Sequence, residues 1–298
     1  MTTKNENKYL RKPDWIRSNL ILSEKAGAIL KMLKKKGLHT VCQEASCPNK
    51  GTCWNNNDIT FLVMGPHCTR NCKFCNVEST FPDKLNLNEP SLISDVINQL
   101  KSDYSVITSV TRDDLEDYGC SHFVNIIKTI KKNCNTAIEL LIPDFKTKKE
   151  FLSNIINENP DVIGHNIETV ERLYPETRPN TTYDKTLKVI KLLKMNQNKI
   201  AVKSSLMVGL GETIQEILTT AQQVKNAGAD IFYLGQYLQP SPKHIPVKKY
   251  YHPDEFNSLE KKIKKLGFSV VLAGPLVRSS FKAKESYLKY KEEIRRRS

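Results

Sequence analysis

The stretch ITFLVMGPHCTRNCKFCN, residues 59–76, joins a run of apolar residues to a loop that holds three cysteines. The run is apolar on both of its faces, which is typical of a parallel strand that helices cover on either side. Cys68, Cys72 and Cys75 follow it in C-x3-C-x2-C spacing. Functional side chains gather on the loops at the carboxyl ends of parallel strands. This stretch therefore predicts an α/β protein with a thiol-based site directly after its first strand.

Six further runs of the same kind follow along the chain. They begin at Tyr104, Thr136, Asp161, Ala201, Asp230 and Phe268. Helical patterns stand between them, over residues 91–101, 122–132, 146–158, 184–195, 213–226 and 254–266. This alternation predicts a partial or complete (β/α) barrel of about six to seven parallel strands over residues 59–274. We expect residues 1–58 and 275–298 to be N- and C-terminal extensions that cover the barrel mouth.

The composition excludes several classes of protein. With 298 residues, 39% hydrophobic and 26% charged, the chain is neither collagen-like nor disordered, and no apolar run approaches the roughly 20 residues that a membrane span needs. The first residues carry Glu6 and Asp14 and lack the apolar segment of a secretory signal, so we expect a cytoplasmic protein. Disulfides rarely persist there, so the eight cysteines are buried residues, catalytic thiols or metal ligands.

The net charge of +14, from 46 basic and 32 acidic residues, has two interpretations. The basic residues either lie on solvated helix faces or attract an acidic partner. Because they are interleaved with acids and no RNA-binding aromatic motif is present, an acidic protein is favoured over nucleic acid as that partner.

The three cysteines of the first loop, Cys68, Cys72 and Cys75, are named the loop triplet below. Three thiolates are one fewer than an all-cysteine iron–sulfur cluster needs, so one iron would remain open. A zinc site with His67 is the alternative, although zinc sites usually contain two closely spaced ligand pairs. Together with Phe74, the loop triplet resembles the signature of the radical S-adenosylmethionine superfamily. That resemblance implies a 4Fe-4S cluster whose open iron binds the amino and carboxylate groups of S-adenosylmethionine.

A second group of cysteines, the N-terminal triplet, consists of Cys42, Cys47 and Cys53 in C-x4-C-x5-C spacing. As in the loop triplet, three cysteines lie within one loop, so two triplets predict two clusters. Three unrelated buried thiols are the alternative. Cys120 and Cys134 stand apart from both groups. An isolated cysteine in such patterns is most often a small core residue, and we assign these two no role.

Several stretches of this chain resemble the lipoyl synthase family within that superfamily. They are the N-terminal triplet with its flanking residues and residues 109–119, 165–179, 203–212, 236–241 and 274–281. The resemblance implies that the N-terminal triplet binds an auxiliary cluster, with a serine of an Arg-Ser-Ser motif as fourth ligand. Here that serine is Ser279 or Ser280, and we favour Ser280. Without the resemblance, residue preferences at helix ends would predict only that the Ser-Ser pair caps the N-terminus of a helix. Phe281 departs from the tyrosine that is common in the family.

Other polar residues are weaker candidates for binding S-adenosylmethionine. Asn166 and Glu168 follow a predicted strand, where barrel side chains reach the mouth. Arg178 and Lys203 are suited to pair with the methionyl carboxylate or with other acids. Glu212 closes a glycine-rich turn that either admits a ligand or simply starts a helix.

The resemblance further implies the reaction and its partners. The family inserts two sulfur atoms at C6 and C8 of a protein-bound octanoyl-lysine, with the auxiliary cluster as sulfur donor. Expected partners are octanoylated lipoyl carrier domains (2-oxoacid dehydrogenase E2 subunits and the glycine cleavage H protein), an electron donor such as flavodoxin or ferredoxin, and iron–sulfur assembly proteins. Because hydrogen abstraction by a radical needs no general base, His67 and His165 are expected to be structural. The alternatives are a methylthiotransferase, a biotin synthase-like enzyme, or a zinc-stabilised nucleic-acid-binding module.

Overall fold

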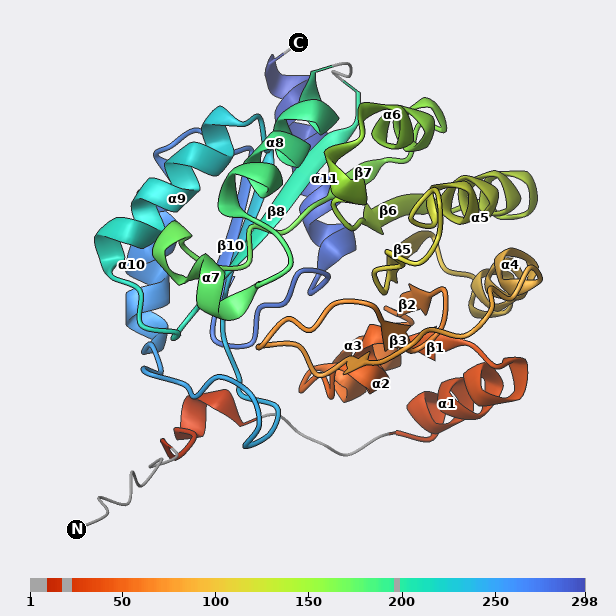
Figure 1. Ribbon diagram of the computed structural model, residues 1–298, viewed down its shortest axis with the longest axis horizontal. Coiled ribbons are helices and arrows are strands. Elements are labelled where there is room, and N and C mark those ends of the chain that lie inside the picture. Colours follow the sequence, from red (N-terminus) through yellow and green to blue (C-terminus); the bar gives the residue numbers. More distant parts are fainter. Residues whose placement is uncertain (1–9, 18–22, 196–198, 298) are drawn as a thin grey trace.

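A largely parallel sheet forms the centre of the molecule (Figure 1). The structure is a computed structural model and describes residues 10–17, 23–195 and 199–297. In spatial order the sheet contains β1 (His39–Thr40), β2 (Thr60–Val63), β5 (Tyr104–Ser109), β6 (Ala137–Leu141), β7 (Val162–Gly164), β8 (Ala201–Val208), β9 (Ile231–Gln236) and β10 (Val270–Gly274). Only β1 pairs in the antiparallel direction among these strands. The seven predicted parallel strands are therefore confirmed, and they form a partial barrel.

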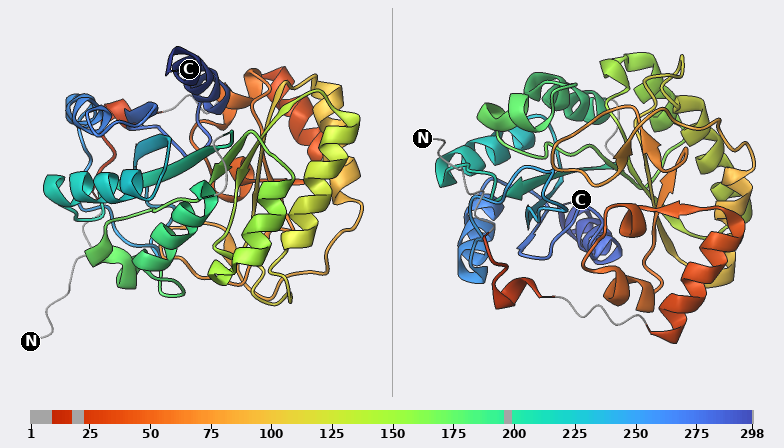
Figure 2. Two further views of the ribbon diagram at one scale, coloured as in Figure 1. Left: turned by 90° about the horizontal axis from the view of Figure 1, so that it is seen from above. Right: turned by 60° about the horizontal axis from the view of Figure 1, so that its bottom comes forward.

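A layer of helices surrounds the sheet (Figure 2). It contains α4 (Glu89–Leu100), α5 (Cys120–Asn133), α6 (Lys149–Asn157), α8 (Tyr183–Lys194), α9 (Ile214–Asn226) and α10 (Pro253–Lys264). Each of them buries a periodic apolar stripe, such as Ile126, Ile127 and Ile130 of α5, against the strands. All six helical patterns that the sequence predicts are thus helices in the structure.

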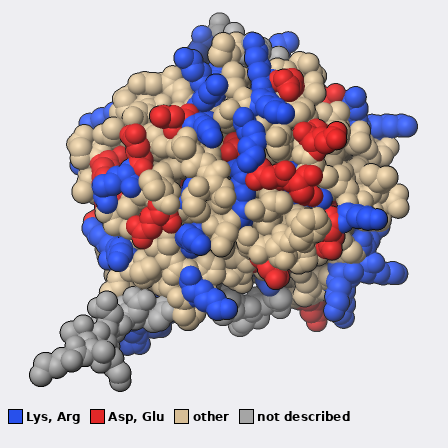
Figure 3. Space-filling view, viewed as in Figure 1, with Lys and Arg blue, Asp and Glu red and all other residues tan. Residues whose placement is uncertain are grey.

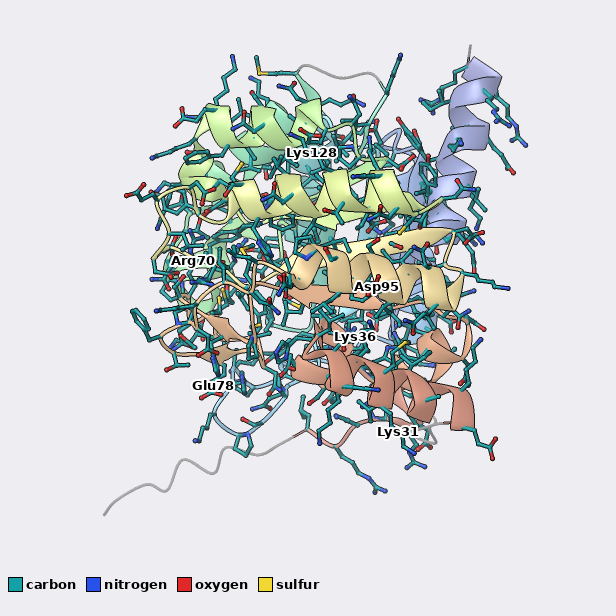
Figure 4. All side chains as sticks on the ribbon, turned by 90° about the vertical axis from the view of Figure 1, so that its right-hand side faces the viewer. Lys31, Lys36, Arg70, Glu78, Asp95 and Lys128 are labelled. Carbon is teal, nitrogen blue, oxygen red and sulfur yellow. The ribbon has the colours of Figure 1, made fainter. Side chains whose placement is uncertain are left out.

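Further elements, two of them full helices, lie outside this alternation. They are α1 (Glu24–Lys36), α2 (Val41–Glu44), α3 (Lys50–Asn55), α7 (Tyr174–Thr177), α11 (Ala283–Arg297), the 3-10 turns η1 (Asp14–Ile16), η2 (Phe145–Thr147) and η3 (Glu171–Leu173), and a small parallel pair of strands, β3 (His67–Cys68) and β4 (Glu78–Ser79). Ser23 caps α1 by accepting a hydrogen bond from the amide of Ala26. Lys36 of α1 reaches Asp95 of α4 at 3.2 Å, so α1 extends the helical layer (Figure 4).

The sheet is open between its edge strands β1 and β10, because no ladder joins them among the described residues. The C-terminal extension occupies this opening. Its helix α11 packs against Val162, Ala201, Ile231 and Val270, which are the first residues of four strands. α11 therefore closes the floor of the barrel, opposite the mouth that we expect it to cover, and the part of the C-terminal extension that lines the predicted auxiliary site lies within residues 278–284.

Basic and acidic side chains are interspersed over the face drawn in Figure 3. In the part of the chain that the structure describes, none of the helices is long and apolar enough to cross a membrane.

Candidate active site and cluster-binding loops

The loop triplet lies on one cavity at the barrel mouth, directly after β2. The backbone amides of Arg70 and Thr111 donate hydrogen bonds to Cys68 Sγ at 3.4 and 3.3 Å. Burial, with a smaller contribution from Cys72 and Cys68, raises the pKa of Cys75 to about 12. Because bound thiols must be deprotonated, metal binding at this loop releases protons.

Arg70, which is labelled in Figure 4, lies inside this loop and anchors it to the ends of two neighbouring strands, β5 and β6. Its guanidinium donates two hydrogen bonds to Asp113 at 2.8 and 2.9 Å and two to Asp144 at 2.7 and 2.8 Å. The pKa of each carboxyl is held below its usual range by the bonds from Arg70, which overcome the opposing effect of burial. The position of Arg70 between Cys68 and Cys72, together with the acidic pair in TRDD, residues 111–114, is a signal for its contact with Asp113 that we did not use.

Arg70→Met is expected to lower the free energy of unfolding of the cluster-free protein by about 3–5 kcal/mol. The substitution leaves Asp144, whose side chain is 2% exposed, without its counter-charge. Denaturant unfolding of the two proteins measures this difference. In wild type the contribution of both carboxyls is present above their unfolded pKa of about 4 and is lost as the pH falls through the lower folded pKa. A difference that persists unchanged at pH 2 would contradict this origin.

The cavity beside the loop triplet, of about 170 Å³, presents polar atoms that have no partner in the protein. They are Ser109 Oγ, His165 Nε2 and Arg178 Nε, within the residues that the structure describes. His165 Nδ1 lies 2.9 Å from the carbonyl of Ile142, and burial lowers the pKa of His165 to about 4. The ring is therefore neutral with Nδ1 as donor, which leaves Nε2 as an acceptor on the cavity wall. Such orphaned buried groups fit a polar ligand.

Asn166, Glu168 and Arg178 line the same cavity. The first two follow β7, the strand after which we expected them to reach the mouth, and Arg178 follows α7. Arg178 donates to the Tyr174 hydroxyl at 2.9 Å and to the carbonyl of Asn166 at 3.3 Å. Burial raises the pKa of Glu168 and of Cys72, and the positive charge of Arg178 opposes that effect at both. Arg178 therefore supplies a buried positive charge between a thiol and a carboxyl group.

The N-terminal triplet and the Arg-Ser-Ser motif line a second cavity, although about 220 residues separate them in sequence. Thr60 donates a hydrogen bond to Ser280 Oγ at 2.8 Å. Burial and the neighbouring thiols raise the pKa of Cys42 to about 11 and that of Cys53 to about 12. Both serines border this cavity, and Ser279 also borders the central cavity described next.

A central cavity of about 430 Å³ lies between the two triplets. Phe74 and Cys75, from the loop that holds the loop triplet, border this cavity. Ala45 and Pro48, which lie between the cysteines of the N-terminal triplet, border it as well. Arg278 separates it from the N-terminal triplet and donates to the carbonyls of Gln236 and Val277 at 3.0 and 2.8 Å. The sequence reasoning assigned no role to this arginine.

Known proteins resemble this chain in sequence and in fold. Residues 62–224 match the model of the Radical SAM superfamily. The chain is 46% identical over 279 residues to a lipoyl synthase from Caldicellulosiruptor bescii, covering 93% of this chain and 96% of that protein. It is 42% identical to a lipoyl synthase from Alkaliphilus metalliredigens, covering 95% and 98%. The chain belongs to the lipoyl synthase family.

Solved structures agree with the barrel fold of this lipoyl synthase family member. SuiB from Streptococcus suis bound to S-adenosylmethionine has a TM-score of 0.56 at 12% identity, covering 89% of this chain and 59% of that one. Methylornithine synthase has a TM-score of 0.54 at 13% identity, covering 72% and 70%. At such identities the likeness shows the fold alone.

Membership of the lipoyl synthase family settles the class of chemistry. The Radical SAM superfamily implies a 4Fe-4S cluster and S-adenosylmethionine, and the loop triplet with its polar cavity fits both. Among the described residues, no group of three or more His, Cys, Asp or Glu side chains is arranged around a single ion. The thiols of each triplet line a cavity wall instead.

Two predicted binding residues lie away from the cavities of this lipoyl synthase family member. Lys203 Nζ donates to Glu139 at 2.8 Å inside the barrel, so its acidic partner belongs to the protein itself. Glu212 accepts hydrogen bonds from the amides of Gly209 and Leu210 at 2.7 and 2.9 Å and therefore closes its own turn. These bonds explain both residues without a ligand.

The remaining cysteines and His67 take structural places. Cys120 is buried in the main hydrophobic core and Cys134 packs against its edge, as predicted. His67 lies 3.7 Å from Glu78 and 3.3 Å from Asp83, on the small β3–β4 pair.

Gly235 of β9 determines how close the Arg-Ser-Ser segment lies to the barrel. A Cβ atom at this position would stand 2.1 Å from the carbonyl oxygen of Val277. Gly235→Ala is therefore expected to push residues 277–280 away from the N-terminal triplet. If the N-terminal triplet binds an auxiliary cluster, we expect its iron to fall at least severalfold, whereas iron at the loop triplet should not change. Iron and sulfide analysis of the reconstituted variant measures this, and a wild-type iron content would contradict it.

Proposed function

We propose that this chain inserts two sulfur atoms at C6 and C8 of an octanoyl-lysine on a carrier protein, with an auxiliary cluster on the N-terminal triplet as sulfur donor. The observation that carries this proposal is the central cavity, because it borders the segments of both triplets. A substrate in that cavity lies between a site that generates a radical and a site that supplies sulfur. Family membership supports the same reaction.

The loop triplet and its cavity make the radical source in this proposal. When bound there, S-adenosylmethionine and the cluster supply a 5'-deoxyadenosyl radical, which can remove hydrogen from an unactivated carbon. Arg178 pairs with the carboxylate of the methionyl group, because a guanidinium binds carboxylates with directional hydrogen bonds. Asn166 and Glu168 hold polar groups of the same molecule. Arg70 keeps the loop in place through Asp113 and Asp144.

The central cavity suits an octanoyl chain. Its apolar lining comprises Leu62, Phe74, Val77, Leu141, Met207 and Val277. Such side chains bind an alkyl group by removing it from water, worth about 0.8 kcal/mol for each buried CH₂.

The N-terminal triplet and Ser280 would hold the auxiliary cluster. Ser280 borders only the cavity of this triplet and is oriented by Thr60, whereas Ser279 also borders the central cavity. Serine oxygen is a harder ligand than thiolate and suits iron–sulfur iron less well. We therefore assign Ser280 as a weak fourth ligand, which can release its iron when the cluster gives up sulfur.

Ser280→Cys is expected to assemble the auxiliary cluster and to form 5'-deoxyadenosine, yet to lose at least tenfold of its lipoyl product. The added thiolate binds iron more firmly than serine does and resists release. Single-turnover mass spectrometry of the carrier measures the product. Full product from Ser280→Cys would refute a labile serine ligand, and a loss at Ser279→Cys alone would move the ligand by one residue.

Octanoylated carrier domains are the proposed partners, namely E2 subunits of 2-oxoacid dehydrogenases and the glycine cleavage H protein. The net charge of +14 supports an acidic carrier surface. Flavodoxin or ferredoxin as electron donor and iron–sulfur assembly proteins complete this proposal, in a cytoplasmic setting.

The proposed reaction is tested by one anaerobic turnover of the reconstituted protein with S-adenosylmethionine, a reductant and an octanoylated carrier. Mass spectrometry should show two sulfur atoms added to the octanoyl-lysine, with two molecules of 5'-deoxyadenosine formed per product. S-adenosylhomocysteine as a second product would instead identify a methylthiotransferase. An unmodified carrier in the presence of both intact clusters would refute the proposal.

A further inference from the structure

A network of buried polar side chains occupies the floor of the barrel and takes no part in the reaction proposed above. At its centre, Lys203 Nζ donates to Glu139 Oε1 at 2.8 Å, and both side chains are 3% exposed. A buried ion pair adds little net stability, because its desolvation cost offsets the attraction between the charges. Such an ion pair instead fixes the geometry of the groups that it contacts.

One arm of the network leads from Lys203 to α11. The ring of Tyr233 lies over the ammonium group, with its centre 4.1 Å from Lys203 Nζ. The Tyr233 hydroxyl donates to Ser286 Oγ at 2.6 Å and lies 3.5 Å from the carbonyl of Lys282. This arm therefore ends on the first turns of α11, just after the Arg-Ser-Ser segment.

A second arm leads from Glu139 to the same turns. The Tyr104 hydroxyl donates to Glu139 Oε2 at 2.5 Å. The ring of Tyr104 lies 5.6 Å from that of Tyr287 on α11 and borders the cavity of the N-terminal triplet. Both arms thus join the barrel floor to the helix that begins three residues after Ser280.

Apolar packing alone fixes α11 weakly. Within the described part of this helix, Ala283, Ser286 and Tyr290 are the buried residues, and only two of the three are apolar. With so small an apolar stripe, the register of α11 depends on polar contacts of fixed length and direction. Besides the bond to Ser286, the Tyr287 hydroxyl donates to Asp161 at 2.5 Å and Lys284 Nζ donates to Asp103 at 2.6 Å, but of these three bonds only the one from Tyr233 to Ser286 is fully buried.

We propose that Tyr233 and Ser286 are positioning residues, which set the register of α11 and thereby hold Ser280 opposite the N-terminal triplet. The inference rests on the proposed function for the role of Ser280. Lys203, Glu139 and Tyr104 are the remaining members of this network. In the folded chain, this network keeps Ser280, the weak fourth ligand, within reach of a cluster on the N-terminal triplet.

The test uses the full-length reconstituted enzyme with the variants Tyr233→Phe, Ser286→Ala and the double variant. Tyr183→Phe is the matched control, because its hydroxyl bonds Gln223 at 2.6 Å between α8 and α9, away from α11. Hydrogen exchange of residues 276–286 and the lipoyl product formed per 5'-deoxyadenosine are measured. We expect about five- to tenfold faster exchange there and at least a fivefold lower product ratio in each single variant. The double variant should be no worse than the worse single one.

The two readouts separate the inference from the function on which it rests. Unchanged exchange in 276–286, or equal effects in Tyr183→Phe, would overturn the positioning role. Faster exchange with a wild-type product ratio would mean that the segment is positioned but that Ser280 does not serve sulfur insertion. If Tyr233→Phe folds poorly, Ser286→Ala removes the same bond with a smaller change of volume.

Discussion

Cys72→Ala abolishes the formation of 5'-deoxyadenosine and all lipoyl product if the loop triplet binds the cluster that activates S-adenosylmethionine. Removing one of three thiolates leaves too few ligands for a cluster that already has an open iron. The N-terminal triplet lines a separate cavity and should keep its own iron. Chromatography of the nucleoside products, together with iron analysis, measures both effects.

Cys120→Ala is the matched control for this result. Cys120 is a buried cysteine whose thiol donates to the carbonyl of Phe151, outside the cavities of both triplets. The Cys120→Ala variant should form 5'-deoxyadenosine at the wild-type level when the rate is expressed per amount of folded protein. Formation of 5'-deoxyadenosine by Cys72→Ala above the cluster-free background would refute the role of the loop triplet.

Cys47→Ala should show the opposite pattern, in which cleavage of S-adenosylmethionine continues in part and lipoyl product is lost. The loop triplet and its polar cavity remain intact in this variant, whereas the auxiliary site loses one of its three thiolates. A single turnover with octanoylated carrier, followed by mass spectrometry, measures the sulfur that is transferred. Sulfur insertion at the wild-type level would make the N-terminal triplet structural and would remove the sulfur donor from the proposed function.

The barrel was predictable because its strands are nearly continuous apolar runs that have no other stable place in a soluble protein. α1 was equally readable, since Ala26, Ile29 and Leu33 repeat at helical spacing between a serine cap and Gly37, but we did not predict it. α11 could not be predicted in this way. Its buried residues are one alanine, one serine and one tyrosine, so its sequence resembles that of a charged helix exposed to solvent.

The candidate site, like the fold, was predictable from the sequence only in part. Cysteine spacing identified both triplets, because the ligands of one triplet lie within a short segment. Partners that lie far apart in sequence were not predictable: nothing local shows that Lys203 meets Glu139 or that Arg70 meets Asp144. Glu139 and Lys203 lie on β6 and β8, with β7 between them, so this pair forms only when the folded sheet brings the two charges together. Arg70 and Asp144 likewise follow β2 and β6, with β5 between them.

The hydrogen bond between Thr60 and Ser280 joins residues that lie 220 positions apart, and this separation has a consequence for biosynthesis. The residues that line the cavity of the loop triplet lie between positions 68 and 181. The wall of the other cavity also needs residues 278–284, which the ribosome adds after all the other lining residues. If the N-terminal triplet binds the auxiliary cluster, its cavity therefore becomes complete only late in synthesis, and loading of that site is a late step.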